Sequence, residues 1–361
     1  MIEKTMPKLI YIIGPNFCVK SLAHESLEML SKEYEVICVS EGPFISEKFF
    51  NHVPIEFTRE PNVFKDIISL VQLIKIIWTN RNAKKIVIST PKIAFLGSLA
   101  CIINMKKYSY LHRGAVYQNF NGIKLKLYKS MDKFIILFSN KTSFISESLF
   151  KWVKNELNLK NINYSREYNS SKGVDLKKFY PLKNKTYGEN INIGFCGRVA
   201  RDKGFEEIIS LIKNYSDNSN INIYVKGKIE LNDKDEDIFT ELIKNKEVYF
   251  EKWDENVANF YRRIDILFFP SKREGFGNVA AEAAACGIPT VAYNIPGIRD
   301  AIGNNISGLL FDENTNLDEE IDLIINDKEK LEYLSNNCRE YAKNNFDQIK
   351  VLKDLHKSLG L

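Results

Sequence analysis

Two glutamates, Glu274 and Glu282, flank the sequence GFGN, and an alanine-rich run follows it. The apolar run DILFFP before them is typical of a buried strand, and TVAY after them of a second strand. The alanine-rich run between predicts a helix with Asn278 as its N-cap and with Gly287 and Pro289 ending it. Ligands bind at the carboxyl ends of the strands of a parallel sheet. We therefore expect both carboxylates to face one small ligand.

A second stretch, GFCGRVARDKGFEE, carries the cations Arg198 and Lys203. Its pattern predicts a strand ending at Gly197, a basic loop, and a helix beginning near Phe205. Glycine permits close approach of a ligand, while two cations and the free N–H groups of a helix start favour a phosphate. The spacing is neither GxxxxGK[ST] nor GxGxxG. The stretch indicates a diphosphate site or, alternatively, an ordinary turn with solvated cations.

Strands and helices alternate along the whole chain, which is typical of parallel sheets with helices on both faces. In the first half we expect strands at KLIYIIG, EVICVS, KIVIST and YSYLHRG, with helices between them. The apolar segments KFIILFS and KTSFISES follow. Residues 169–192, rich in Gly, Pro, Asn and Lys, interrupt the pattern and are predicted to be a linker. A second alternation then runs from INIGFCG to a helical tail, so the fold class is α/β.

The size and composition fit a two-domain globular protein. The chain has 361 residues, of which 44% are apolar and 27% charged. Its six cysteines are scattered without a CxxC pair, which favours reduced core thiols. The N-terminus lacks the layout of a signal peptide, and the most apolar run, residues 93–105, is too short to span a bilayer. We expect a cytoplasmic protein without a transmembrane anchor.

Charge is unevenly distributed between the two halves. Residues 1–180 carry 27 basic and 15 acidic side chains, whereas the remainder carries 24 and 31. The excess of positive charge indicates either an anionic partner for the first half or a solvated lysine-rich surface. Nucleic acid is disfavoured because no binding motif appears. The run VFKDIISLVQLIKIIW is amphipathic enough to touch a membrane, but a helix packed on the sheet is the favoured interpretation.

The stretches GRVARDKGFEEII, YRRIDILFFPSKREGFGNVAAEAAACGIPTVAY, GIRDAI and SGLLF resemble, in that order, the C-terminal domain of retaining glycosyltransferases. FISESL, NSSKGVDLKKFYP and TPKIAFLGSLA are similar to first-domain segments of bacterial enzymes that build O-antigen, capsule and related lipid-linked glycans. The resemblance implies a glycosyltransferase B-type architecture, with two Rossmann-like domains facing each other across a cleft. It implies an acceptor-binding domain over residues 1–180, a sugar-nucleotide-binding domain over 181–340 and a C-terminal helix, 341–361, that returns to the N-terminal domain.

The resemblance also implies a role for each matching residue. Arg198 and Lys203 would hold the diphosphate of the donor and stabilise it as the leaving group. Glu282 would bind the ribose hydroxyls, and Glu274 the hydroxyls of the donor sugar. The other donor-binding residues that it implies are Gly14, Gly197, Gly275, Phe276, Gly277, Asn278 and Val279. The nucleotide base is expected near VKGKIE and EKWDENV.

The segment YLHRG matches the place after the fourth strand where the family usually has a polar residue, often histidine. Either His112 or Arg113 occupies that place, and relatives with an Arg-Gly sequence favour Arg113.

The sequence has no nucleophile–base set and no DxD or histidine cluster that would hold a metal. Leaving-group stabilisation must then carry the reaction, without metal or cofactor. The resemblance implies retention of anomeric configuration, a UDP-hexose or UDP-N-acetylhexosamine donor and an undecaprenyl-diphosphate-linked acceptor. It implies a peripheral position at the inner face of the cytoplasmic membrane.

Three other classes of protein share some of these features. A nonhydrolysing sugar-nucleotide epimerase shares the architecture and is the alternative, although it would carry more acid and base side chains. A dehydrogenase is disfavoured because GxGxxG is missing. A two-lobed solute-binding protein is disfavoured because no signal peptide is present.

Overall fold

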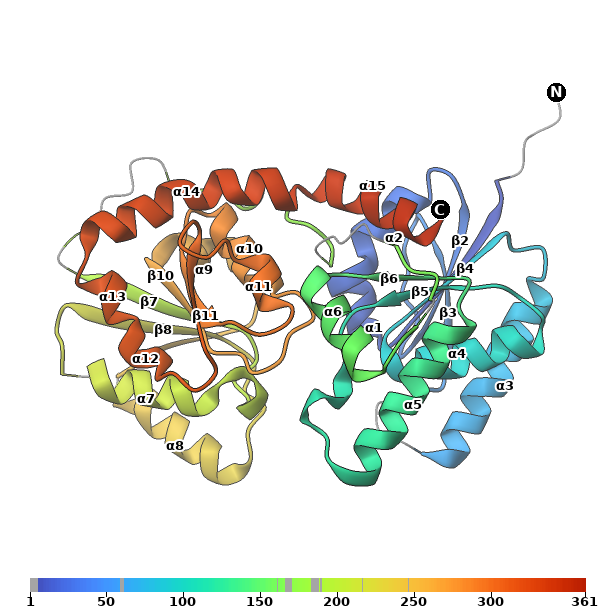
Figure 1. Cartoon of the computed structure of the whole chain (residues 1–361), viewed down its shortest axis with the longest axis horizontal. Coiled ribbons are helices and arrows are strands. Elements are labelled where there is room, and N and C mark those ends of the chain that lie inside the picture. Colours follow the sequence, from blue (N-terminus) through green and yellow to red (C-terminus); the bar gives the residue numbers. More distant parts are fainter. Residues whose placement is uncertain are drawn as a thin grey trace. The chain divides into compact units, whose positions relative to one another are not determined.

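The computed structural model describes residues 6–58, 62–160, 162–165, 171–182, 188, 190–215, 217–245 and 247–361. The chain divides into two compact units, a first unit of Met1–Lys172 with Val351–Leu361 and a second unit of Gly173–Lys350. Each unit contains one six-stranded parallel sheet with helices between its strands (Figure 1). Parts of the predicted linker, residues 169, 170, 183–187 and 189, lie outside the described residues.

The sheet of the first unit has the strand order β3-β2-β1-β4-β5-β6. Its strands are β1 (Lys8–Ile13), β2 (Glu35–Glu41), β3 (Asn51–Ile55), β4 (Lys85–Ser89), β5 (Ser109–His112) and β6 (Lys141–Phe144). All neighbouring strands are parallel, and their central residues are almost wholly buried. This order reverses between β1 and β4, so the carboxyl ends of these two strands form the switch point of the first sheet.

The helices of the first unit follow the strands with short loops. They are α1 (Asn16–Cys18), the π-helical turn η1 (Val19–Ala23), α2 (His24–Leu30), α3 (Val63–Thr79), α4 (Pro91–Ile103), the 3₁₀ turn η2 (Val116–Asn119), α5 (Gly122–Phe138) and α6 (Glu147–Glu156). The last helix, α15 (Gln348–Leu359), ends in this unit, where the Ser109 hydroxyl donates to the Leu359 carbonyl at 2.8 Å. Helices α3, α4 and α5 lie side by side on one face of the sheet (Figure 1).

The sheet of the second unit repeats the topology of the first. Its strands are β7 (Ile191–Cys196), β8 (Ile221–Gly227), β9 (Tyr249–Lys252), β10 (Ile266–Phe269), β11 (Thr290–Tyr293) and β12 (Gly308–Phe311), in the order β12-β11-β10-β7-β8-β9. Counted within the unit, this is the 3-2-1-4-5-6 order of a Rossmann sheet, as in the first unit. The predicted α/β class with two Rossmann-like domains is therefore confirmed.

The helices of the second unit agree with the predicted alternation. They are the 3₁₀ turn η3 (Arg201–Lys203), α7 (Phe205–Tyr215), α8 (Asp233–Lys244), α9 (Val257–Arg263), α10 (Asn278–Ala285), α11 (Ile298–Ala301), α12 (Leu317–Glu320), α13 (Asp322–Ile325) and α14 (Lys328–Phe346). Asn278 was expected as the N-cap of α10, and this prediction is wrong. Asn278 is the first helical residue, and the cap is Gly277, whose φ of 87° is favourable for glycine.

The sequence pattern did not predict two elements of the first unit, strand β3 and helix α5. Strand β3 contains Pro54 and lies at the edge of its sheet, where a missing N–H is tolerated and the usual alternation is weak. The apolar segment KFIILFS forms the end of α5, because a short apolar run alone does not distinguish a strand from a buried helix segment. The six cysteines are all buried and none forms a disulfide, as predicted. In the described ranges, no helix combines the length and apolar character needed to cross a membrane.

His356 ties α15 to the first unit and makes its stability depend on pH. The ring is buried, and its Nε2 lies 2.8 Å from the Ser26 hydroxyl of α2. Burial lowers the pKa of His356 from 6.5 to about 4. The unfolded chain therefore binds a proton more readily than the folded one, and stability is lost as the pH falls from about 6.5 towards 4.

We expect a His356→Gln variant to lose less stability on acidification than the parent. Both proteins would carry Trp253→Phe, so that the remaining tryptophans, Trp78 and Trp152, report only on the first unit. Between about pH 7.5 and about pH 5, the free energy of unfolding of the parent should fall by about 2 kcal/mol more than that of the variant. Urea titrations followed by tryptophan fluorescence measure it, and equal falls would contradict the assignment.

Candidate active site

The predicted site residues of the second unit meet at the switch point of its sheet. The strand order reverses between β7 and β10, so the loops that follow these strands leave the sheet side by side. Arg198 and Lys203 lie in the loop after β7, and Glu274 lies in the loop after β10. Sequence analysis had placed these residues in two separate motifs, and the topology joins them.

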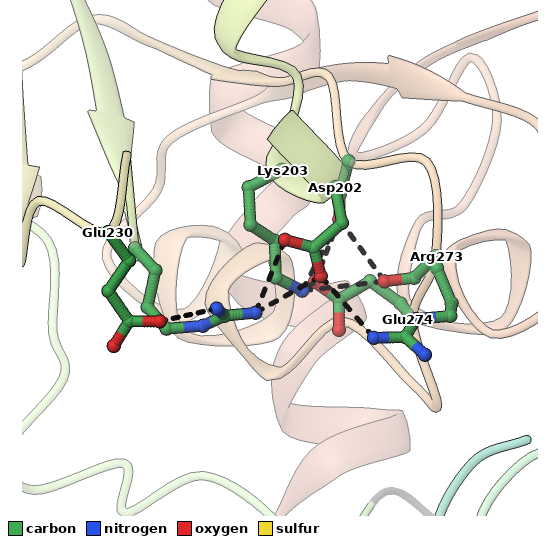
Figure 2. Close-up of polar contacts among 7 residues, drawn as sticks. Asp202, Lys203, Glu230, Arg273 and Glu274 are labelled. Atoms are coloured by element: carbon green, nitrogen blue, oxygen red, sulfur yellow. Dashed lines mark hydrogen bonds and ion pairs between the residues drawn. The ribbon is translucent and has the colours of Figure 1, made fainter. Parts of the chain in front are cut away.

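Lys203 and Glu274 form the ion pair at the centre of this site. The Lys203 ammonium lies 2.6 Å from Glu274 Oε1, and both side chains are about one-fifth exposed. Figure 2 shows the two side chains pointing towards each other, with Asp202 and Arg273 beside them. The Ser271 hydroxyl also donates to Glu274 Oε1 at 3.1 Å. A charged hydrogen bond therefore links the loop after β7 to the loop after β10.

Arg198 is held by two carboxylates. Its Nη1 donates to Glu230 Oε2 at 2.7 Å, and its Nη2 donates to Asp202 Oδ2 at 3.1 Å. Burial lowers the pKa of Arg198, but the bonds to Glu230 and Asp202 outweigh this and raise it overall. The bond from Arg198 likewise lowers the pKa of Glu230. The guanidinium is oriented and permanently charged, with about a third of the side chain exposed.

Asp202 connects Arg198 to Arg273, and it was not predicted as a site residue. Its carboxylate accepts from Arg198 and lies 3.4 Å from Arg273 Nη2. Burial raises the pKa of Asp202, but the charges of Arg198, Lys203 and Arg273 outweigh burial and lower it overall. Asp202 follows Arg198 by four positions, and Arg273 directly precedes Glu274. In the sequence, only the closeness of Asp202 and Arg273 to the predicted motifs pointed to these two residues. The spacing within the motifs assigned neither of them a role.

Two glycines allow the loops of the site to pack backbone against backbone. Gly204 has φ of 84°, and a Cβ atom there would collide with the Pro270 carbonyl. Gly297 has φ of 91°, and its Cβ would lie 2.5 Å from the Glu274 carbonyl oxygen and 2.8 Å from the Gly275 carbonyl carbon. A side chain at Gly297 would therefore displace the glutamate loop. Sequence analysis missed this role because it depends on contacts between distant segments.

The start of α10 presents unused hydrogen-bond donors. Within the part of the chain that the structure describes, the backbone N–H groups of Phe276, Gly277, Asn278 and Val279 donate to no protein acceptor. The Phe276 ring anchors this turn, because it is 3% exposed and packs edge-on against Phe346. Such donors at a helix start favour an anion.

Glu282 lies further along the same helix and is 7% exposed. Its Oε2 accepts a hydrogen bond from the Tyr261 hydroxyl of α9 at 3.2 Å. Burial raises the pKa of Tyr261 well above its usual value, so the phenol remains a donor. Tyr261 therefore positions Glu282, and no sequence pattern pointed to this partner.

The segments VKGKIE and EKWDENV, where the base was expected, are joined through Lys226. This lysine is the last residue but one of β8, is 2% exposed, and its ammonium lies 2.9 Å from the Asp254 carboxylate and 3.3 Å from that of Glu251. At the same edge, Gly197 has φ of 151° and donates to the Lys226 carbonyl at 2.9 Å. A Cβ at Gly227 would collide with the Gly197 carbonyl, so the loops after β7 and β8 approach closely.

The first-unit candidates lie at the carboxyl edge of the first sheet. Arg113 is half-buried, and its Nε donates to the Ser89 hydroxyl at 3.0 Å. Its Nη1 donates to the Ser171 hydroxyl at 2.7 Å and to the Ser171 carbonyl at 3.1 Å. Its Nη2 donates to the Leu22 carbonyl at 3.1 Å and reaches the Tyr11 hydroxyl at 3.4 Å. Arg113, which follows β5, thus links the end of β4 to Tyr11 of β1, to the turn η1 and to Ser171.

His112 belongs to a buried network rather than to an exposed surface. It is 0% exposed, and its Nε2 lies 2.9 Å from Asp132 Oδ2. Tyr110 and Tyr117 also donate to Asp132, at 3.2 and 3.1 Å, and burial raises the pKa of both phenols. Among the described residues, His112 Nδ1 has no hydrogen-bond partner.

Gly14 follows β1, and its N–H donates to the Thr90 hydroxyl after β4 at 3.1 Å. It therefore lies at the switch point of the first sheet. A Cβ there would meet Phe57 at 3.3 Å and Ile93 at 3.4 Å, so the position is closely packed.

The second-unit arrangement offers two kinds of binding group. Cations and free N–H groups suit an anion such as a diphosphate, and carboxylates suit the hydroxyls of a sugar. In the described ranges, no three or more His, Cys, Asp and Glu side chains are grouped so that they could hold a metal ion.

Comparison with known proteins identifies the second unit. Residues 177–344 match the family described as glycosyl transferases group 1. The chain is 28% identical to the capsular polysaccharide biosynthesis glycosyltransferase CapM of Staphylococcus aureus over 96% of its length and 95% of that protein.

Solved structures share the fold over nearly the whole chain. Sucrose-phosphate synthase from Thermosynechococcus elongatus has a TM-score of 0.79 at 15% identity, covering 97% of this chain and 98% of that one. Anabaena HepE in complex with UDP-glucose has a TM-score of 0.76 at 15% identity, covering 98% and 99%. The second unit thus matches the group 1 glycosyltransferase family, and the similarity to CapM and the shared fold extend over nearly the whole chain.

Proposed function

We propose that the protein transfers a hexosyl or N-acetylhexosaminyl group from a UDP-sugar to a lipid-linked sugar in the synthesis of a bacterial surface polysaccharide. The observation that carries the proposal is the linkage of Arg198, Lys203 and Glu274 beside the unused N–H groups of α10. Cations and N–H donors suit a diphosphate, and a carboxylate beside them suits the sugar attached to it. The relationship to CapM supports surface polysaccharide as the product, and UDP-glucose bound to HepE supports a UDP donor.

In the proposed reaction, the bond between the anomeric carbon and the diphosphate oxygen breaks, and an acceptor oxygen bonds to the same carbon. The acceptor proton passes to the released diphosphate. Arg198 and Lys203 stabilise the charge that develops on the leaving oxygen, and the start of α10 adds its N–H groups. Glu274 binds sugar hydroxyls and Glu282 the ribose, while Gly197, Gly275, Phe276, Gly277, Asn278 and Val279 form the surface around the phosphates. We propose retention of configuration, with the acceptor approaching from the face that the diphosphate leaves, and no metal requirement.

The first unit is proposed to bind the acceptor, an undecaprenyl-diphosphate-linked sugar, at the inner face of the cytoplasmic membrane. Of the two residues expected at the catalytic place, Arg113 is half-buried and His112 is wholly buried. We therefore propose that Arg113 contacts a substrate by exchanging one of its present hydrogen bonds for a bond to that substrate. Gly14 lies at the same edge of the first sheet. The epimerase alternative is not pursued, because the relationship to CapM favours a transferase.

Removal of either cation should slow the reaction by roughly two orders of magnitude or more, because the leaving diphosphate loses a fixed charge. The variants are Arg198→Ala and Lys203→Ala, and initial rates with UDP-sugar and lipid acceptor measure the loss. Arg201→Ala is the matched control, because Arg201 lies in the same loop but pairs with Asp235 and Glu206. Near-normal rates for both test variants would refute their role.

The two glutamates should separate nucleotide binding from sugar binding. We expect Glu282→Gln to reduce the thermal shift given by UDP, because a ribose contact is lost. Glu274→Gln should retain more of the thermal shift given by UDP than Glu282→Gln does. It should lose the additional thermal shift that a UDP-sugar gives beyond UDP. UDP at a hundredfold excess over its Kd should stabilise the wild type by about 2.7 kcal/mol. GDP, ADP, CMP and NAD complete the panel, and a response to NAD alone would overturn the proposal.

Glu230 should compete with the donor for Arg198. The bond at 2.7 Å must be exchanged if the diphosphate is to use the same guanidinium. We expect Glu230→Gln to bind UDP about two- to fivefold more tightly at low salt, which is the range of a partly exposed ion pair. Isothermal titration measures the Kd, with Glu236→Gln as control because this exposed residue removes the same charge from the same unit. Weaker binding by Glu230→Gln would instead make Glu230 part of the donor site.

A further inference from the structure

Helix α3 has apolar side chains on two opposite faces. Its buried residues Ser69, Leu73 and Ile77 recur every four positions and pack against the protein. The exposed residues Phe64, Ile67, Ile68, Val71 and Trp78 follow helical spacing on the opposite side, and we call these five residues the outer stripe. Phe64 is 82% exposed and Trp78 62% exposed. Thus the helix packs on the first unit, as the sequence predicted, and still presents a second apolar face.

This apolar surface continues from α3 across to α5. A groove of about 300 Å³ runs between α3, α4 and α5 and is lined mainly by apolar side chains, among them Ile67, Leu70, Phe95, Leu127 and Met131. Beyond it, α5 exposes Ile123, which is 87% accessible. Figure 1 shows the three helices side by side on the same face of the first sheet. Contiguous apolar surface of this kind marks an interaction site.

The charges around this surface are almost all positive. Helices α3, α4 and α5 contain seven lysines, two aspartates and no glutamate. Asp132 is buried in the His112 network, and Asp66 is paired with Lys92 at 2.6 Å. Lys65, Lys75 and Lys124 are exposed. In the sequence, Lys65 and Lys75 lie among the residues of the outer stripe, and Lys124 directly follows Ile123. The surface therefore combines exposed apolar side chains with uncompensated cations.

We propose that this surface binds a bilayer containing anionic lipids, with the outer stripe among the acyl chains and the lysines against the headgroups. A helix with an apolar stripe and flanking lysines has the composition that lies in a membrane interface. A second copy of the chain is a poorer occupant, because a symmetric contact would bring together two copies of a face whose helices contain seven lysines and two aspartates, both already bonded within their own chain. The inference deepens the proposed function by naming the surface through which the enzyme meets the membrane that carries its acceptor.

Vesicle sedimentation tests the proposal without donor or acceptor. The full-length protein should pellet with vesicles of phosphatidylcholine and phosphatidylglycerol, and much less with phosphatidylcholine alone. The variant Phe64→Gln/Ile67→Gln/Val71→Gln should bind at least about tenfold more weakly, as should Lys65→Gln/Lys75→Gln/Lys124→Gln. The matched control, Ile306→Gln/Leu323→Gln/Tyr333→Gln, removes three exposed apolar residues from the second unit and should bind like the wild type.

The fluorescence of Trp78 reports directly on the proposed contact between α3 and the bilayer. In a Trp152→Phe/Trp253→Phe protein, Trp78 is the remaining tryptophan, and its emission should shift to the blue and be quenched by brominated acyl chains. Vesicle binding without quenching of Trp78 would overturn the proposed surface. So would absence of binding to anionic vesicles, or a lipid-free dimer that the α3 triple variant converts to monomer. A wild type that ignores UDP would refute the donor proposal but leave the vesicle result standing.

Discussion

The ion pair between Lys203 and Glu274 is the interaction on which the site of the second unit depends. It joins the loop after β7 to the loop after β10, which are far apart in the sequence and adjacent at the switch point. Both side chains are about four-fifths buried, so either charge without its partner would be costly to hold there. The same contact fixes Glu274 beside the start of α10. In the proposed function, this one charged hydrogen bond positions the groups for the diphosphate and for the sugar relative to each other.

That pair can form only because the surrounding backbone comes unusually close. Gly204 allows the first loop to pass the Pro270 carbonyl, and Gly297 allows a later loop to support Glu274 and Gly275 from behind. Gly277 takes the positive φ that starts α10 directly after the glutamate loop. Each glycine therefore serves a contact between segments that are remote in sequence. The geometry of the site is a property of the sheet topology as much as of the motifs.

The sequence predicted what local patterns determine. Alternating apolar runs located most strands and helices, and cation and carboxylate motifs at their ends located Arg198, Lys203, Glu274 and Glu282. Local patterns did not determine the partners of these groups, because Glu230 and Tyr261 lie on other elements. They also missed β3 and the start of α5, where an edge proline and a lysine-rich surface weaken the periodic signal. The outer face of α3 was visible as amphipathicity, but only the fold shows which apolar stripe is left exposed.

The balance of charge in the site limits how a donor can be attracted. Arg198, Lys203 and Arg273 face Asp202, Glu230 and Glu274, so the contacts already neutralise three cations with three carboxylates. An incoming diphosphate must exchange partners with these groups rather than fill an empty positive pocket. The unused N–H groups of α10 require no such exchange, and they supply the first favourable contact for an anion. When the diphosphate takes over the cations, the displaced carboxylates remain beside the ligand and need hydrogen-bond donors. The hydroxyls of a sugar can supply these donors, whereas a bare phosphate cannot. Under the proposed function, a site balanced in this way would favour a sugar nucleotide over inorganic phosphate, because only the complete donor satisfies both the cations and the carboxylates.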